Sequence, residues 1–186
     1  MDRGLCVPAE HGGVRSDSDR RVLPKVEIKP LDASDFKEYY IFCGLYWEYW
    51  FQVNGEDLSE EIEFKLDDGK RVVTTELEVF LHQQFKDGFQ VHLVIMDDAP
   101  CGFLLYQRVF DGIIVIRGMF LEKELIGTGA GFQLLDDLNP KKVIFQSSKS
   151  RVPEEMLKVT EPFREKVSET DKKITWIMNW EGRHGR

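Results

Sequence analysis

Between a predicted strand and a predicted helix the chain reads Ile126-Gly-Thr-Gly-Ala-Gly-Phe-Gln-Leu-Leu135. Glycines at alternate positions leave the backbone N–H groups of such a loop uncovered. The N-terminus of the following helix favours an anion such as a pyrophosphate, through its dipole and its unpaired donors. The loop therefore predicts a phosphate cradle. The structural alternative is a tight turn whose glycines only permit close packing of the helix.

Two familiar phosphate loops do not fit this stretch. A Walker loop requires Lys and then Ser or Thr after its last glycine, whereas Phe132 and Gln133 stand there. A dinucleotide-binding loop lies within a parallel βαβ unit, whereas these glycines follow an antiparallel hairpin. The sequence therefore indicates neither an NTPase nor a Rossmann dehydrogenase.

The segments around the loop predict most of the sheet. Strands are expected over residues 91–96, 102–110 and 113–121, and the tight turns between them make neighbours antiparallel. A helix over 132–138 ends at Asn139-Pro140, and the next strand, 142–146, is expected to run parallel to the strand before the glycines because a helix connects them. Further on, we expect a helix over 154–166, a strand over 174–180 and a fraying tail over 181–186.

The N-terminal part predicts a tail, a strand and two helices. Residues 1–24 show no sustained period and are expected to form a mobile tail, so that the folded domain spans 25–181. A strand over 26–30 precedes an aromatic-rich helix, residues 36–51, for which Asp32 or Ser34 offers an N-cap. That helix is either a core helix or the wall of a substrate pocket. Thr75 and Glu78 form a capping box for a helix that ends at Asp87-Gly88.

Composition excludes several classes of protein. The 186 residues carry 25 Lys and Arg against 33 Asp and Glu, a net charge of −8 that argues against a nucleic-acid partner. The three cysteines and four histidines lie in no metal-ligand spacing, so no metal is expected and the thiols are expected to be reduced. The chain has neither a membrane-length apolar run nor a signal peptide at its start, which favours the cytoplasm.

On these residues the chain resembles the GNAT superfamily of acyl-CoA-dependent N-acetyltransferases. Gly129-Ala-Gly131 occupies the two glycine slots of that family's signature, and Leu134-Leu135 the apolar pair of the helix that follows. The order of elements is similar too: strand, two helical segments, three antiparallel strands, glycine loop, helix, strand, helix, strand. The resemblance implies an α+β fold with a mixed, mostly antiparallel sheet flanked by helices.

The resemblance also implies an activity, the direct transfer of an acetyl group from acetyl-CoA to a primary amine. Residues Met119, Phe120 and Leu121 would then hold the pantetheine arm and the thioester, and Gly127, Thr128, Gly129, Ala130 and Gly131 the pyrophosphate. Glu122 or Glu124 would take the proton of the amine, and Ser147 or the neighbouring Ser148 would protonate the leaving thiolate. Arg117 would pair with a substrate carboxylate or with a neighbouring acid.

Two departures from the family's pattern keep a second function open. Ile126 stands where the family has Arg or Gln, and no tyrosine follows Tyr106 to act as the general acid. The alternative is therefore an inactive GNAT-fold protein that acts as an interaction or structural module. An exposed patch at Trp47 and Trp50 would serve a partner or a homodimer. The acidic residues 56–63 favour a cationic acceptor such as a polyamine or a lysine side chain.

Overall fold

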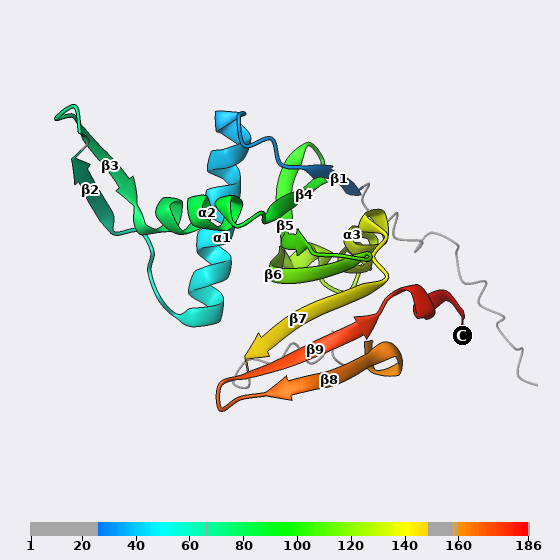
Figure 1. Ribbon diagram of the computed structural model, residues 1–186. Coiled ribbons are helices and arrows are strands. Elements are labelled where there is room, and N and C mark those ends of the chain that lie inside the picture. Colours follow the sequence, from blue (N-terminus) through cyan, green and yellow to red (C-terminus); the bar gives the residue numbers. More distant parts are fainter. Residues whose placement is uncertain (1–25, 66, 149–157, 159, 186) are drawn as a thin grey trace, which may run out of the picture.

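The computed structural model describes residues 26–65, 67–148, 158 and 160–185. Its centre is a seven-stranded sheet in the order β1-β4-β5-β6-β7-β9-β8, flanked by helices (Figure 1). The parallel pair β6–β7 makes this an α+β fold with a mixed, mostly antiparallel sheet. The strands are β1 (Val26–Pro30), β2 (Glu61–Lys65), β3 (Arg71–Thr75), β4 (Gln90–Met96), β5 (Ala99–Arg108), β6 (Ile113–Leu121), β7 (Lys142–Ser148), β8 (Arg164–Glu169) and β9 (Lys173–Asn179). The helices are α1 (Phe36–Asn54), α2 (Glu76–Lys86) and α3 (Ala130–Leu138).

Each face of the sheet carries its own hydrophobic cluster, as the side-chain alternation of β5 illustrates. Phe103 and Leu105 point to one face and pack with α1 and α2. Leu104 and Tyr106 point to the other face and pack with α3. The aromatic-rich helix is therefore largely a core helix, and its buried side chains include Phe42 and Tyr46.

Several predictions from the sequence are confirmed. The strands β4, β5 and β6 are antiparallel neighbours, and β7 runs parallel to β6. The helix after the glycines ends with Asn139 in the left-handed conformation. The predicted mobile tail, residues 1–24, lies outside the described residues, and the domain boundaries stay predictions.

Other predictions are wrong or incomplete. Asp35, rather than Asp32 or Ser34, caps α1, because its side chain accepts hydrogen bonds from the N–H groups of Lys37 and Glu38. A separate two-stranded sheet, in which β2 and β3 flank a turn at residues 67–69, was not predicted from the sequence.

The helix predicted over 154–166 does not reach its expected end. Residues 154–157 and 159 lie outside the description, but a 3-10 helix spans Glu161–Phe163 and strand β8 begins at Arg164. Among the described strands β8 pairs with β9 alone, and it forms an edge of this sheet, where charged side chains are tolerated.

The predicted fraying of the C-terminal segment is also wrong, since Glu181–Gly185 form a 3-10 helix. The Arg183 guanidinium lies 4.2 Å from the ring centroid of Trp180 and 5.3 Å from that of Phe132, and it forms an ion pair with Asp136. The Trp180 indole N–H also donates to Asp136, at 3.0 Å. These contacts fix the C-terminal segment against α3.

The predicted capping box at the start of α2 is present. The Glu78 N–H donates to Thr75 Oγ1 at 3.2 Å, and the Thr75 N–H donates to Glu78 Oε2 at 3.0 Å. We expect Thr75→Ala to lower the free energy of unfolding by about 1 kcal/mol, the usual cost of losing an N-cap side chain. Urea unfolding measures this. Ser168→Ala, at an exposed position of β8, is the control and should change the value by less than about 0.5 kcal/mol.

Within the described ranges, no helix combines the length and apolar character that crossing a membrane requires.

Candidate active site

Strands β6 and β7 separate after a short stretch of pairing. Their register comprises Ile113 with Lys142, Ile114 with Val143, and Val115 with Ile144. Beyond it β6 continues to Leu121 and β7 to Ser148, and the two strands diverge (Figure 1). Buried backbone groups require partners. Among the described residues no strand pairs with this edge of β6 beyond Val115, so the edge can meet the hydrogen-bonding groups of a ligand.

A β-bulge interrupts β6 where it leaves β7. On the neighbouring strand, Tyr106 pairs with Ile116 and Leu105 with Gly118, so Arg117 has no partner in β5. Such bulges re-aim side chains and are frequent beside active sites. Arg117 is exposed here.

Two tyrosines of α1 lie close to this bulge. A methyl group on Gly118 would lie 3.0 Å from ring carbon Cε1 of Tyr49 and 3.4 Å from its hydroxyl oxygen. Burial raises the pKa of Tyr49 and of Tyr46, and the charge of Arg117 opposes that rise in both. At neutral pH both tyrosines are therefore neutral hydroxyl groups.

The glycine loop lies just beyond the end of β6. Gly127 and Gly129 have φ angles of +79° and +91°, a left-handed conformation that non-glycine residues adopt only with strain. A methyl group on either would meet nothing within 4 Å, so neither glycine is needed for close packing. Within the described part of the chain, the N–H groups of Gly127, Gly129 and Gly131 donate to no backbone oxygen or side chain. The loop thus presents free donors at the N-terminus of α3.

Packing and hydrogen bonds hold the loop in place. Leu125 is fully buried, and Thr128 Oγ1 donates to its carbonyl oxygen at 2.7 Å. The Ala130 N–H in turn donates to Thr128 Oγ1 at 3.3 Å. A methyl group on Gly131 would contact Leu121 at 3.6 Å, which places the loop beside the end of β6. The free donors are therefore preorganised.

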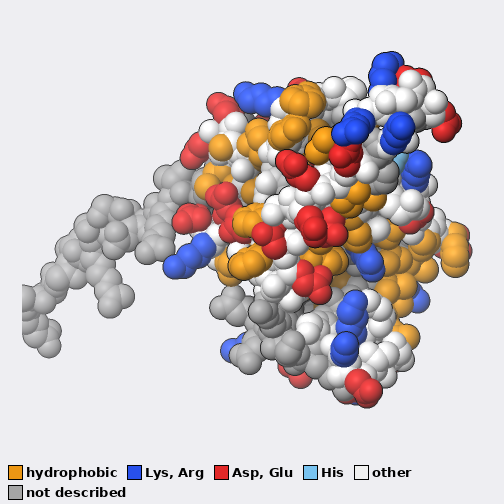
Figure 2. Space-filling model, turned by 90° about the vertical axis from the view of Figure 1, so that its left-hand side faces the viewer, with side chains coloured by type: hydrophobic (Ala, Val, Ile, Leu, Met, Phe, Trp, Pro, Cys, Tyr) orange, Lys and Arg blue, Asp and Glu red, His pale blue; other side chains and the backbone are white. Residues whose placement is uncertain are grey.

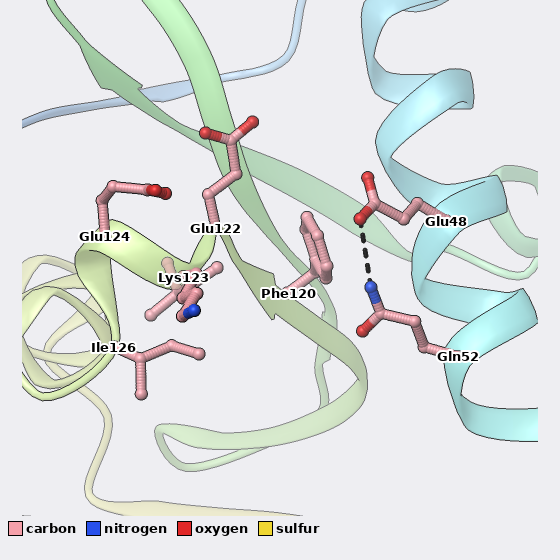
Figure 3. Close-up of a pocket in the computed structure, with 8 residues that line it drawn as sticks. Glu48, Gln52, Phe120, Glu122, Lys123, Glu124 and Ile126 are labelled. Carbon is pink, nitrogen blue, oxygen red and sulfur yellow. Dashed lines mark hydrogen bonds between the residues drawn. The ribbon is translucent and has the colours of Figure 1, made fainter.

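A cleft of about 320 Å³ lies between α1 and the turn that follows β6. Figure 3 shows the two helix side chains on one side of it and the β6–turn residues on the other. Gln52 Nε2 donates to Glu48 Oε1 at 3.0 Å. Three carboxylates and one ammonium group make the cleft acidic. The lining residues are Glu48, Gln52, Phe120, Leu121, Glu122, Lys123, Glu124 and Ile126.

The structure brings some of the predicted site residues together. Glu122, Glu124, Phe120 and Leu121 line the cleft, whereas Met119 packs in the cluster that includes α3. The Glu122 N–H donates to the Cys101 carbonyl oxygen at 2.9 Å, which fixes the backbone of this residue. Glu124 is exposed on a 3-10 helix, Lys123–Leu125.

Ser147 lies apart from these residues. It is buried on β7, does not line the cleft, and accepts a hydrogen bond from Trp176 Nε1 at 3.0 Å. Its neighbour Ser148 is half-buried at the end of the same strand. Tyr49, in contrast, lies directly beside Gly118 at the bulge of β6.

The alternative that the helix over 36–51 forms the wall of a pocket is thus borne out in part, since Glu48 and Gln52 line the cleft. Sequence reasoning did not single out these two residues or Tyr49, all on α1. The available signal was the spacing of the polar pair: Glu48 and Gln52 are four residues apart and so share one face of an otherwise aromatic helix. Nothing local indicated that this face borders the end of β6. In the described residues no group of three or more His, Cys, Asp or Glu side chains could hold a metal ion.

Comparison with known proteins identifies the fold. No protein-family model matches the chain, and neither does the sequence of any curated protein. Solved structures do match, over 83–84% of this chain and 93–99% of theirs. A putative GNAT-family acetyltransferase of Desulfovibrio desulfuricans superposes with a TM-score of 0.56 at 13% identity. The ribosomal-protein-S18-alanine N-acetyltransferase of Escherichia coli superposes with 0.53 at 11% identity. The PaiA N-acetyltransferase of Thermoplasma acidophilum, in complex with coenzyme A, superposes with 0.55 at 8% identity. Together with the sheet order and the diverging strands, these matches make the chain a GNAT-fold protein.

Proposed function

We propose that this chain is an N-acetyltransferase that moves an acetyl group from acetyl-CoA directly to a primary amine. The observation that carries the proposal is the position of the glycine loop. Its three N–H groups and the neighbouring edge of β6 have no partner among the residues that the structure describes. A pyrophosphate needs such donors, and a pantetheine arm needs such a strand edge. The likeness to a CoA-bound N-acetyltransferase supports the same reading.

The residues of the chain fit acetyl-CoA as the donor substrate. Residues 127–131 would hold the pyrophosphate, and Met119, Phe120 and Leu121 would offer backbone groups to the pantetheine arm and to the thioester carbonyl. A backbone N–H aimed at that carbonyl oxygen stabilises the negative charge that develops there in the transition state. The exposed Ile126 supplies no charge for the phosphates, so the backbone donors would carry this binding.

In the proposed reaction the amine nitrogen attacks the thioester carbonyl carbon. The carbon–sulfur bond then breaks, one amine proton passes to a carboxylate and the thiolate of CoA takes up a proton. Glu122 suits the role of base because it lines the cleft on a fixed backbone. The Tyr49 hydroxyl beside Gly118 suits the role of acid.

The acceptor that fits the cleft is a cationic amine. Glu48, Glu122 and Glu124 outweigh Lys123 along the lining, and negative charge raises the local concentration of a cation. The acidic stretch 56–63, from which a cationic acceptor was predicted, does not contribute to this lining. Polyamines and lysine side chains are therefore the first acceptors to assay.

Calorimetric titration with CoA and with acetyl-CoA, followed by an assay of acetyl transfer to spermidine and to lysine peptides, tests the proposal. We expect dissociation constants in the micromolar range, about −8 kcal/mol of binding free energy, and acetylated product. No binding at about 1 mM ligand would overturn the proposal and leave a GNAT-fold interaction module.

Replacing the proposed base tests the mechanism. We expect Glu122→Gln to lower kcat about 100-fold, since a positioned general base contributes at least that factor. The affinity for CoA should not change. Glu124→Gln is the matched control and should retain most of the activity because Glu124 is exposed on the 3-10 helix. Loss of activity in Glu124→Gln alone would assign the base to Glu124 instead.

A further inference from the structure

The outer face of α1 carries a stripe of exposed aromatic side chains. Phe36, Tyr40, Trp47 and Phe51 are 74, 56, 38 and 49% exposed. Trp50, expected in an exposed patch, instead packs in the core beside Phe80. Figure 2 shows the side of the molecule on which α1 and the β2–β3 hairpin lie, where hydrophobic side chains are interspersed with Asp and Glu. Exposed aromatic rings in a row are typical of a contact surface.

The four rings of this stripe form two ordered pairs. The centroids of Phe36 and Tyr40 are 4.5 Å apart, and those of Trp47 and Phe51 are 5.8 Å apart and stacked. The Trp47 indole N–H donates to Asp57 Oδ1 at 2.9 Å, which holds that ring. The rings are thus arranged before any partner binds, and binding requires less loss of side-chain freedom.

Gly44 lies between the two pairs, in the middle of the exposed face. A methyl group there would meet none of the described residues within 4 Å, so packing among these residues does not require a glycine. Glycine in the interior of a helix lowers its stability relative to alanine. A second backbone that crosses α1 at Gly44 would explain this residue, because only glycine allows the closest approach.

The spacing of the stripe is symmetric about Gly44 to within one residue. Tyr40 lies four residues before it and Trp47 three after, while Phe36 lies eight before and Phe51 seven after. In an antiparallel pair of identical helices, a two-fold axis at Gly44 brings each residue opposite the one equally far on the other side. Tyr40 then faces Trp47 of the second copy, and Phe36 faces Phe51, each within about one helical rise of 1.5 Å.

Two charged side chains of α1, Lys37 and Glu48, would also meet their opposite charges across this two-fold axis. Lys37 lies seven residues before Gly44 and Glu48 four after, on the flank opposite the aromatic rings. The two-fold axis brings them together across the interface, about 4.5 Å apart along the helix axis. Neither side chain has an ion pair among the described residues. We infer that this chain forms a homodimer in which α1 pairs antiparallel with α1 of a second copy, centred on Gly44.

The area of the stripe suits such a dimer. At about 150–250 Å² per aromatic side chain, the exposed fractions amount to roughly 450 Å² per chain. Two copies would bury roughly 900 Å², and the flank with Lys37 and Glu48 brings the total to the ~1,000 Å² of specific interfaces. Because Glu48 also lines the cleft, the partner's Lys37 would lie beside the proposed acceptor site.

Sedimentation equilibrium of the full chain tests the dimer. We expect the wild type to be a dimer at micromolar concentration and the double variant Phe36→Ser, Phe51→Ser to dissociate at least about 100-fold more readily, since buried aromatic anchors dominate interfaces. Phe110→Ser is the matched control, because Phe110 is 73% exposed in the β5–β6 turn, away from α1, and it should leave the dimer intact. A monomeric wild type, or a dimer indifferent to the double variant, would overturn the inference.

Two further variants distinguish this pairing from any other contact through the stripe. Gly44→Glu should raise the melting temperature of the monomer, because glutamate favours helix, and abolish the dimer, because two like charges would meet on the axis. Lys37→Glu should weaken the dimer about tenfold, since each ion pair occurs twice, and adding Glu48→Lys should restore it. The antiparallel pairing would be ruled out if the Lys37→Glu, Glu48→Lys variant dimerised no better than Lys37→Glu alone. It would also be ruled out if the Gly44→Glu variant remained a dimer.

Discussion

Gly129→Glu is expected to raise the dissociation constant for CoA about 1,000-fold. The φ angle of +91° at Gly129 costs any other residue roughly 1–2 kcal/mol, so the free variant would relax the loop and binding would have to restore its strained conformation. The new carboxylate would also repel the pyrophosphate that the free N–H groups of Gly127 and Gly131 are proposed to bind. Each charge-assisted hydrogen bond lost contributes about 1.5–3 kcal/mol. Together these losses exceed the roughly 4 kcal/mol that a 1,000-fold change requires.

The matched control for Gly129→Glu is Gly69→Glu. Gly69, in the turn between β2 and β3, has a φ angle of +82° and the same open surroundings as Gly129. Both variants therefore suffer the same backbone strain and add the same charge, but only one does so at the glycine loop. Calorimetric titration with CoA should show wild-type affinity for Gly69→Glu. Equal affinity in both variants would contradict the assignment of the loop to the pyrophosphate.

The sequence could predict the parts of the fold that local signals determine. The apolar run of β5, the tight turns around it and the glycines before α3 are all readable within a few residues. The capping box at Thr75 is likewise a local signal, and the structure has it. Together these signals predicted the antiparallel strands, the strand β7 that runs parallel to β6, and the position of the glycine loop.

Elements that depend on distant partners could not be predicted in this way. The sequence of β8 is Arg-Glu-Lys-Val-Ser-Glu, whose charges favour no strand, and pairing with β9 decides its conformation. The same holds for the candidate site. Glu48 and Tyr49 reach β6 only because α1 packs across that face of the sheet. The loop was therefore predictable. The sequence offered α1 as a pocket wall only as one of two alternatives, and it did not indicate which of its side chains line the cleft.

The largest effect on stability is expected from replacing Phe103, the side chain of β5 against which α1 packs. Phe103 of β5 is fully buried and lies edge-on to Phe42 and Tyr49 of α1, with centroid distances of 5.4 and 5.6 Å. It also stacks with Phe120 at 6.1 Å, which ties α1 to the strand that ends at the cleft. Phe103→Ala should lower the free energy of unfolding by about 3–5 kcal/mol, through lost burial and the cavity that remains.

That loss is large beside the total of about 5–15 kcal/mol that stabilises a domain of this kind. Urea unfolding followed by tryptophan fluorescence measures it, with Phe110→Ala as the control, since the exposed Phe110 should contribute less than about 0.5 kcal/mol. A soluble Phe103→Ala variant should also lose acetyl transfer more than CoA binding. The reason is that α1 supplies Glu48 and Tyr49, whereas the glycine loop is anchored by Leu125 on the other face of the sheet. If acetyl transfer and CoA binding were lost equally, the two faces of the sheet would not position the site independently.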